Sequence, residues 1–197
     1  MSARCPFCDR GALEDRLILE SPNFAVIPTK GQILDGYVLI IPKRHTICFG
    51  DLSESEMDEA VMVLQRVRNA VTAAYGQAPI VFEHGIVGQT VKHAHLHVVP
   101  TAVDLLARIV ADFPEYQKVS TLAAVQETFQ REGPYLYYEN AAGEKHVFRI
   151  FKWPQYLRLV LAEEVGHPER GDWKKMDPIL DAEMMLDTWK KLATALK

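Results

Sequence analysis

The chain has 197 residues, of which 48% are hydrophobic and 24% charged, and its formal net charge is −4 at pH 7. This composition excludes a mainly disordered, collagen-like or low-complexity chain, because apolar residues are plentiful and Gly and Pro number only 11 each. Without a basic excess, the chain shows no general signature of a nucleic-acid or membrane surface. The length fits one domain, or one domain with an extension.

No apolar run reaches the ~20 residues of a membrane span. The first 16 residues contain no apolar signal-peptide core either. We therefore expect a cytoplasmic protein without membrane contact. Three cysteines in such a compartment argue against structural disulfides. The spacing of Cys5 and Cys8 instead indicates metal or redox chemistry.

The first half of the chain predicts short strands around one long helix. From Ser53 to Tyr75 apolar residues recur every three or four positions, and Ser53 and Glu56 have the spacing of a capping box. Four segments rich in β-branched or aromatic residues and bounded by Gly or Pro predict strands: 23–28, 36–42, 79–83 and 92–99.

The second half predicts a hairpin and further helices. Two aromatic segments, 135–139 and 146–151, flank an Asn-Ala-Ala-Gly turn and are typical of a β-hairpin. Because strands and helices mix without regular βαβ order, we expect an α+β fold with an antiparallel sheet. Helices are predicted over 118–131, 155–165 and 178–196.

The most informative segment is GQTVKHAHLHVVP, residues 88–100. Alternate side chains of a strand share a face, so we expect His93, His95 and His97 on one face and apolar residues on the other. An exposed polar face, a catalytic metal site and a nucleophilic histidine are the open interpretations. The outer pair starts about 13 Å apart at ~3.3 Å per residue, so one ion does not easily hold all three imidazoles.

The residues that precede the histidines favour a nucleophile. An imidazole can attack phosphorus, and the phosphoramidate that forms is labile enough to be hydrolysed. Gly88 permits close backbone approach, and Gln89 and Thr90 offer uncharged donors to phosphate oxygens. This combination predicts chemistry on a phosphate group.

The segment resembles the signature of the histidine triad family, in which three histidines alternate with apolar residues after a Gly-Gln-Ser/Thr-Val-x stretch. GYVLIIPKRH, residues 36–45, is similar to the family's strand that ends in Pro-Lys-x-His, although many members have Gly-His where this chain has Gly36-Tyr37. CPFC at residues 5–8 resembles the Cys-x-x-Cys of zinc-bearing members. The resemblance covers roughly residues 5–101.

The resemblance implies a histidine triad fold, with an antiparallel sheet and a main helix, usually paired as a homodimer. It implies a nucleotide hydrolase or nucleotidyltransferase that acts on a substituted α-phosphate, as in a dinucleoside polyphosphate or a nucleoside phosphoramidate. In such an enzyme His95 would be the nucleophile that forms a nucleotidyl-histidine, and His97 would contact the phosphate oxygens. Gln89 would lie near the scissile bridge and Thr90 near the α-phosphate.

Two further residues precede the motif where the family often has an Asn-containing stretch. Glu83 and His84 are therefore candidate substrate-binding residues. A structural role at the end of a strand is an equally open interpretation.

Cys5 and Cys8 have the spacing with which two thiolates bind one Zn²⁺ ion. The resemblance implies that His45 and His93 complete a structural zinc site, as in zinc-bearing members. A redox pair is the weaker alternative because the usual βαβ setting is absent, and a cysteine pair without any cofactor is the third. Cys48 is expected to be a buried small hydrophobe.

Residues 155–175 resemble the C-terminal region of the CwfJ-like branch of the family, which is associated with RNA processing, through the stretch Glu169–Lys174. The alternative function is therefore a nucleotide- or RNA-binding module with little turnover. We expect residues 1–105 to form the histidine triad core and 106–197 an extension packed on the core or at a dimer interface. Four aromatic residues of the second half either stack on bases or pack in the core: Tyr135, Tyr137, Tyr138 and Trp153.

Overall fold

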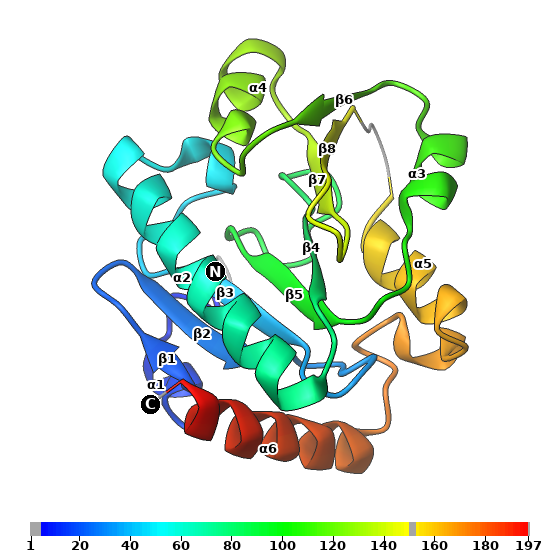
Figure 1. The fold of residues 1–197 in the computed structure, drawn as a ribbon. Helices are drawn as coiled ribbons and strands as arrows, with labels where there is room; N and C mark the ends of the chain where they lie inside the picture. The colour runs from blue at the N-terminus through cyan, green and yellow to red at the C-terminus, as the bar shows by residue number, and fades with distance from the viewer. Residues whose placement is uncertain (1–4, 150–152, 197) are drawn as a thin grey trace.

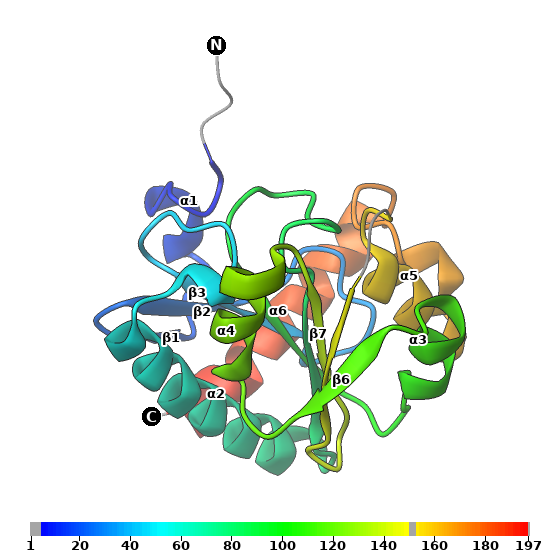
Figure 2. The ribbon, with the colours of Figure 1, turned by 90° about the horizontal axis from the view of Figure 1, so that it is seen from above.

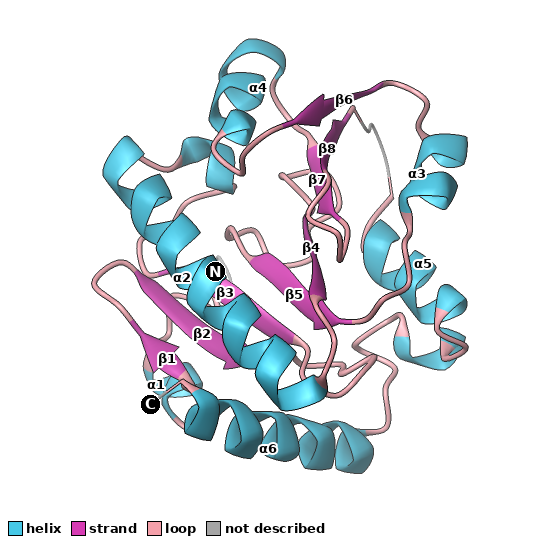
Figure 3. Ribbon diagram, viewed as in Figure 1, coloured by secondary structure: helices cyan, strands magenta, loops and turns pink. Residues whose placement is uncertain are grey.

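The computed structural model describes residues 5–149 and 153–196 and has the predicted α+β architecture (Figures 1 and 3). Within these residues, eight strands form one sheet in the order β1-β2-β3-β5-β4-β7-β8-β6, and every neighbouring pair is antiparallel. The strands are β1 (Leu19–Glu20), β2 (Phe24–Pro28), β3 (Val38–Pro42), β4 (Pro79–Glu83), β5 (Leu96–Pro100), β6 (Tyr116–Val119), β7 (Leu136–Glu139) and β8 (Lys145–Phe148). The helices are α1 (Gly11–Glu14), α2 (Glu54–Tyr75), α3 (Leu106–Asp112), α4 (Ala124–Glu132), α5 (Tyr156–Glu164) and α6 (Pro178–Ala195), with 3-10 turns at Phe49–Asp51 and Pro168–Arg170.

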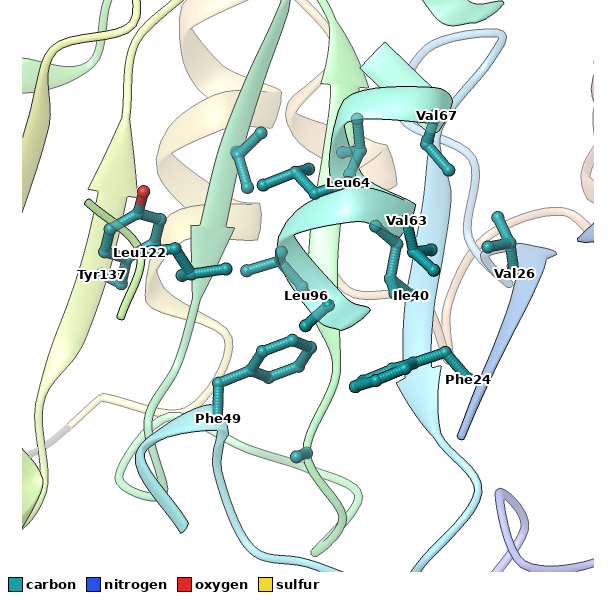
Figure 4. Close-up of a cluster of buried hydrophobic side chains, with 14 of the residues drawn as sticks. Phe24, Val26, Ile40, Phe49, Val63, Leu64, Val67, Leu96, Leu122 and Tyr137 are labelled. Carbon is teal, nitrogen blue, oxygen red and sulfur yellow. The ribbon is translucent and has the colours of Figure 1, made fainter. Parts of the chain in front are cut away.

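Helix α2 begins where the capping box predicts. The Ser53 hydroxyl accepts a hydrogen bond from the Glu56 N–H at 3.3 Å, and the Glu56 carboxylate accepts one from the Ser53 N–H at 2.8 Å. Gly76 ends the helix with a φ of 70°, a conformation that glycine adopts without a steric penalty. The apolar side of α2 packs on one face of the sheet, and Figure 4 shows the shared cluster, which includes Phe24, Val26, Ile40, Val63, Leu64, Val67 and Leu96.

The opposite face of the sheet is covered by α5, with α3 next to it and α1 at the other end of the sheet (Figure 2). A second buried cluster joins Leu39 and Phe82 of the strands to Leu157 of α5. Because side chains alternate along a strand, β5 presents Leu96 to α2 and His97 to this second face. The second face therefore carries the functional side chains.

The strand predicted over 92–99 is observed as β5, which starts only after His95. The Ala94 N–H donates to the Thr46 carbonyl at 2.7 Å, so this segment pairs with the loop that follows β3 and does not continue the sheet ladder. The expectation that the three histidines share one strand face is therefore wrong, because His97 alone of the three lies on a strand.

The helix predicted over 118–131 is observed as strand β6 followed by α4, because its first residues pair with β8 at the sheet edge. The predicted hairpin is observed as β7 and β8, with its turn closed by the Gly143 N–H on the Asn140 carbonyl at 2.9 Å. Residues 150 and 151 of its predicted second strand lie outside the described residues. Helices α5 and α6 match the predicted ones, whereas α1, β1 and α3 had no clear signal in the sequence.

The second half of the chain extends the sheet of the first half. Strand β7 pairs with β4, and Phe82 lies opposite Tyr138. Helix α6 packs beside α2 (Figure 1), and the Gly36 N–H donates to the Thr188 hydroxyl at 2.8 Å. The division of the chain at residue 105 stays a prediction. Among the helices of the described residues, none combines the length and the apolar character needed to cross a bilayer.

Candidate functional site

A cavity of about 140 Å³ opens beside the last two histidines of the motif, on the face of the sheet opposite α2. His95 and His97 form part of its wall, and Arg158 and Trp173 reach it from the second half of the chain. The other residues that line it come from the N-terminal loop, from α1 to β3 and from the motif itself: Pro6, Phe7, Arg16, Thr29, Lys30, Leu39, Thr90 and Val91.

The loop before β5 fixes the orientation of His95. Its Nδ1 lies 2.7 Å from the His93 carbonyl oxygen, so Nδ1–H donates there and Nε2 keeps its lone pair. The residue is only 7% exposed. Burial lowers the pKa of His95 to about 4, against the smaller opposing effect of the His93 carbonyl. The imidazole is therefore neutral near pH 7, which is the form that attacks phosphorus.

The ring of His97 lies 4.8 Å from that of His95 and stacks on Phe82 at 4.4 Å. Burial lowers the pKa of His97 well below its usual value. Its Nδ1 lies 2.6 Å from the hydroxyl of Tyr37, and its buried Nε2 has no hydrogen-bond partner within the described residues. When the phenol donates to Nδ1, Nε2 carries the ring proton and can donate to a ligand oxygen. Tyr37 is thus a site residue whose role the sequence did not indicate.

The structure brings Thr90 to the cavity but turns Gln89 away from it. The Thr90 hydroxyl oxygen accepts a hydrogen bond from the Trp173 indole N–H at 3.2 Å, which leaves the hydroxyl proton free to donate. The Gln89 carboxamide donates to the Ile47 carbonyl at 2.7 Å, and its buried Oε1 has no partner within the described residues. Gln89 therefore belongs to the motif but does not line the cavity.

Glu83 and His84 do not line the cavity. Glu83 is 0% exposed, and its carboxylate accepts hydrogen bonds from the Phe49 N–H at 2.8 Å and from the Tyr135 hydroxyl. His84 accepts the Leu157 N–H at 3.1 Å, and burial lowers its pKa to about 3. Both residues therefore tie the sheet to neighbouring segments.

Glu83→Gln should make the free energy of unfolding less sensitive to a rise in pH from about 4.5 to about 7. Burial raises the pKa of Glu83 to about 7 from 4.5, so the folded protein holds a proton that the unfolded chain releases between these values. As pH rises through that window, Glu83 therefore lowers the free energy of unfolding by about 1.4 kcal/mol per pH unit. Relative to wild type, the variant should gain about 3 kcal/mol of unfolding free energy between about pH 4.5 and pH 8.

Urea unfolding of both proteins across that pH range measures this gain. Buried histidines titrate alike in wild type and variant, so their contribution cancels in the difference. Glu183→Gln on the exposed side of α6 is the control and should show no such trend. A difference between the Glu83 variant and wild type that is constant with pH would contradict the assignment.

The structure brings Cys5, Cys8, His45 and His93 together, with all four ligand atoms within 4.8 Å of one another. Cys8 Sγ lies 3.2 Å from His45 Nδ1, and Cys5 Sγ lies 3.4 Å from His93 Nδ1. A tetrahedral zinc site with usual bond lengths places sulfur and nitrogen ligands about 3.5 Å apart. His93 Nε2 lies 2.8 Å from the Pro42 carbonyl, which orients Nδ1 toward the thiols. The cluster therefore fits a metal ion with two thiolate and two imidazole ligands.

This cluster is linked to the cavity through Phe7, which lies between the two cysteines in the sequence. Its ring packs edge-on against His93 at 5.7 Å and against His95 at 5.3 Å between centroids. Phe7 also lines the cavity. An ion bound at the cluster would therefore hold one wall of the cavity against His95.

The second half contributes residues that the sequence did not assign. Trp173 belongs to the stretch Glu169–Lys174, whose resemblance to the CwfJ-like branch already marked it in the sequence. Arg158 lies inside α5, and nothing in the neighbouring sequence marks it. Three of the aromatic residues considered for base stacking are fully buried, and Trp153 is 53% exposed. The buried three are Tyr135, Tyr137 and Tyr138.

Comparisons with known proteins match the part of the chain that contains the triad motif. The HIT domain family model matches residues 10–103. An uncharacterised HIT-like protein of Mycobacterium tuberculosis is 31% identical over 101 residues, which are 49% of this chain and 70% of the relative. The bis(5'-adenosyl)-triphosphatase of Dictyostelium discoideum is 32% identical over 81 residues, 40% of this chain and 54% of that enzyme. The bis(5'-nucleosyl)-tetraphosphatase of Schizosaccharomyces pombe is 33% identical over 86 residues, 42% of this chain and 43% of that enzyme.

The chain thus spans about half the length of the two enzymes that it matches. It spans more than two thirds of the mycobacterial relative. The family model covers the sheet from β1 to β5 and the whole triad motif. The chain therefore belongs to the HIT, or histidine triad, family.

Proposed function

We propose that this protein is a nucleotide hydrolase or nucleotidyltransferase that attacks a substituted α-phosphate through a nucleotidyl-histidine intermediate. The observation that carries the proposal is a neutral His95 whose Nδ1 is held by the His93 carbonyl, at the wall of a cavity. Similarity to two enzymes named for the hydrolysis of dinucleoside polyphosphates supports a substrate of that class. A nucleoside phosphoramidate is the second candidate substrate.

In the first step His95 Nε2 uses its lone pair to form an N–P bond. The bond from phosphorus to the leaving group breaks, and its electron pair departs with the leaving group, which then takes up a proton. The oxygen of a water molecule, or of another acceptor, then attacks phosphorus and gives its proton to solvent, which replaces the proton that the leaving group took up. The N–P bond breaks, its electron pair returns to His95 Nε2, and the nucleotide is released. This second displacement restores neutral His95.

Neighbouring side chains stabilise the charge that gathers on the phosphate oxygens. His97 Nε2, which is buried and has no partner in the part of the chain that the structure describes, donates to one of them. The Thr90 hydroxyl, which already accepts from Trp173, donates its proton to another. Gln89 acts at the scissile bridge after its carboxamide leaves the Ile47 carbonyl and turns toward the cavity. Such preorganised donors typically contribute about 10²–10³-fold each.

We propose a structural Zn²⁺ ion at Cys5, Cys8, His45 and His93. Two thiols and two imidazoles are the ligand set of a closed structural zinc site, and an ion held by four protein ligands supplies folding energy. The remaining triad residues, His95 and His97, are not part of the cluster, so the arrangement does not favour a metallohydrolase that uses the triad as ligands.

A substrate panel tests the function. Purified full-length protein is incubated separately with diadenosine triphosphate, diadenosine tetraphosphate and adenosine phosphoramidate, and release of AMP is followed. We expect a kcat/KM of at least ~10⁴ M⁻¹ s⁻¹ for one of them. Release no faster than that of the His95→Ala protein for every substrate would contradict an enzyme and leave the binding module as the better interpretation. The homodimer, the cytoplasmic location and RNA as a partner stay predictions.

Tyr37→Phe should lower kcat by roughly 5–10-fold and leave the melting temperature within a few degrees. The change removes the hydroxyl that holds His97 Nδ1 at 2.6 Å, and one hydrogen bond contributes about 1 kcal/mol. Steady-state rates over a range of pH measure the effect, because His97 without its partner should also titrate at a different pH. Tyr116→Phe on the exposed sheet edge is the matched control. Unchanged kinetics in the Tyr37 variant would show that the phenol does not position His97.

A further inference from the structure

Arg158 is a buried cation that has no carboxylate partner among the described residues. The residue is 4% exposed, and within the described residues it takes part in no salt bridge. Its hydrogen bonds all go to backbone carbonyl oxygens. Nη2 donates to Gly31 at 2.7 Å and to Arg170 at 3.4 Å, and Nε donates to Gly171 at 3.3 Å. Its guanidinium also lies over the Tyr37 ring, 5.3 Å from the centroid. Buried charges are usually paired with an opposite charge, so this one indicates an anionic ligand.

The cavity that Arg158 lines is positively charged. Arg16 and Lys30 also line it, and none of the described residues around it is an aspartate or a glutamate. The carboxylate of Asp181 acts on Arg16 from outside this lining, but it already accepts the backbone N–H groups of Gly31 and Gln32 at 2.8 and 3.0 Å. The cavity therefore offers more positive charge than a single phosphate needs.

Arg158 and Trp173 of the second half of the chain pack closely against the loop that contains Lys30 and Gly31. A Cβ atom at Gly31 would lie 2.4 Å from the Trp173 Cβ and 2.8 Å from Arg158 Nη2. Gly31 has a φ of +71°, so a side chain there is disfavoured by conformation as well as by space. Arg158 and Trp173 are therefore held at a fixed place beside the histidines, although both lie outside the residues that match the family model.

We propose that Arg158, with Lys30 and Arg16, forms a second anion subsite that binds the phosphate of the leaving group, next to the phosphate that His95 attacks. The inference rests on the proposed function and assigns this chain a preference for substrates whose leaving group carries phosphate. As the N–P bond forms, the P–O bond breaks and its electron pair stays on the bridging oxygen of the departing phosphate. That phosphate gains one negative charge, which the buried guanidinium stabilises in a site with little water.

An amine leaving group gives the subsite nothing to bind. When a P–N bond breaks, the electron pair goes to nitrogen, which takes up a proton and departs without a phosphate. Removing Arg158 should therefore affect the two classes of substrate differently, whereas a loss of overall structure would affect both alike.

The test compares diadenosine tetraphosphate with adenosine phosphoramidate in Arg158→Gln, in Lys30→Gln and in wild type. For the tetraphosphate, kcat/KM should fall at least ~30-fold in Arg158→Gln and ~5-fold in Lys30→Gln, as expected for lost charge-assisted contacts. For the phosphoramidate the loss in each variant should be at least several-fold smaller than for the tetraphosphate, because no phosphate of a leaving group occupies the subsite. Arg108→Gln on the surface of α3 is the matched control for loss of an arginine and should change neither rate.

A binding measurement separates this proposal from the proposed function. Inorganic pyrophosphate is titrated calorimetrically into wild type and into both variants, which requires no turnover. We expect at least ~10-fold weaker binding in Arg158→Gln and a smaller loss in Lys30→Gln. Because Lys30 is exposed, its variant tests the subsite even if the Arg158 variant does not fold. The subsite proposal is overturned if Lys30→Gln and wild type bind pyrophosphate equally well, or if a variant loses the same activity on both substrates. If no substrate is turned over but pyrophosphate still binds, only the proposed enzymatic function is overturned.

Discussion

Replacing His95 by alanine should lower kcat by at least ~10³-fold, while nucleotide still binds. The change removes the Nε2 lone pair that forms the bond to phosphorus, so the covalent intermediate is lost along with the residue. Binding persists because the donors around the phosphate, among them Thr90 and His97, stay in place. The effect is larger than that of any single hydrogen-bond donor in the cavity.

Mass spectrometry of protein quenched in alkaline denaturant, in which the N–P bond survives, measures the intermediate directly. Wild type mixed with substrate should show a nucleotidyl adduct on the peptide that contains His95, and the alanine variant should show none. His167→Ala, in the loop after α5 and away from the cavity, is the matched control and should keep both adduct and rate. An alanine variant at His95 that turns over at the wild-type rate would end the nucleophile assignment.

Replacing Cys8 by serine should release the metal ion and destabilise the whole protein. We expect about one zinc per wild-type chain and much less in the variant, with a melting temperature lower by roughly 10 °C, which corresponds to about 3 kcal/mol for a chain of this size. Activity should fall too, because Phe7 then loses its support against His95.

Metal analysis of protein purified without chelator, combined with thermal unfolding, checks this expectation. Cys48→Ala removes a buried thiol outside the cluster, so it should cost some stability in the core but keep the zinc content of wild type. A strong chelator should lower the wild-type melting temperature toward that of Cys8→Ser. Wild type without zinc, or a Cys8 variant with full zinc content, would disprove the structural site.

Short sequence patterns predicted the helices and turns that are stabilised by contacts between residues close together in the chain. The capping box and apolar repeat located α2, and the Asn-Ala-Ala-Gly turn located the hairpin of β7 and β8. The segments at 92–99 and 118–131 were misassigned at their ends, because a strand forms only where a neighbouring strand offers hydrogen-bond partners. The loop after β3 supplies such a partner to Ala94, and no periodicity in the sequence reports that contact.

At the site, too, some features could be found from the sequence and others depend on contacts between distant parts of the chain. Residue types and spacing by themselves singled out the triad, the Gln-Thr pair before it and the Cys-x-x-Cys motif, because imidazole and thiol groups offer chemistry that few other side chains provide. Only the tertiary structure decided that Glu83 is a buried structural acid, since its environment comes from Phe49 and Tyr135, distant in the chain. It also decided that Arg158 reaches the cavity, because a guanidinium inside a helix has no local signature until the fold buries it without a carboxylate.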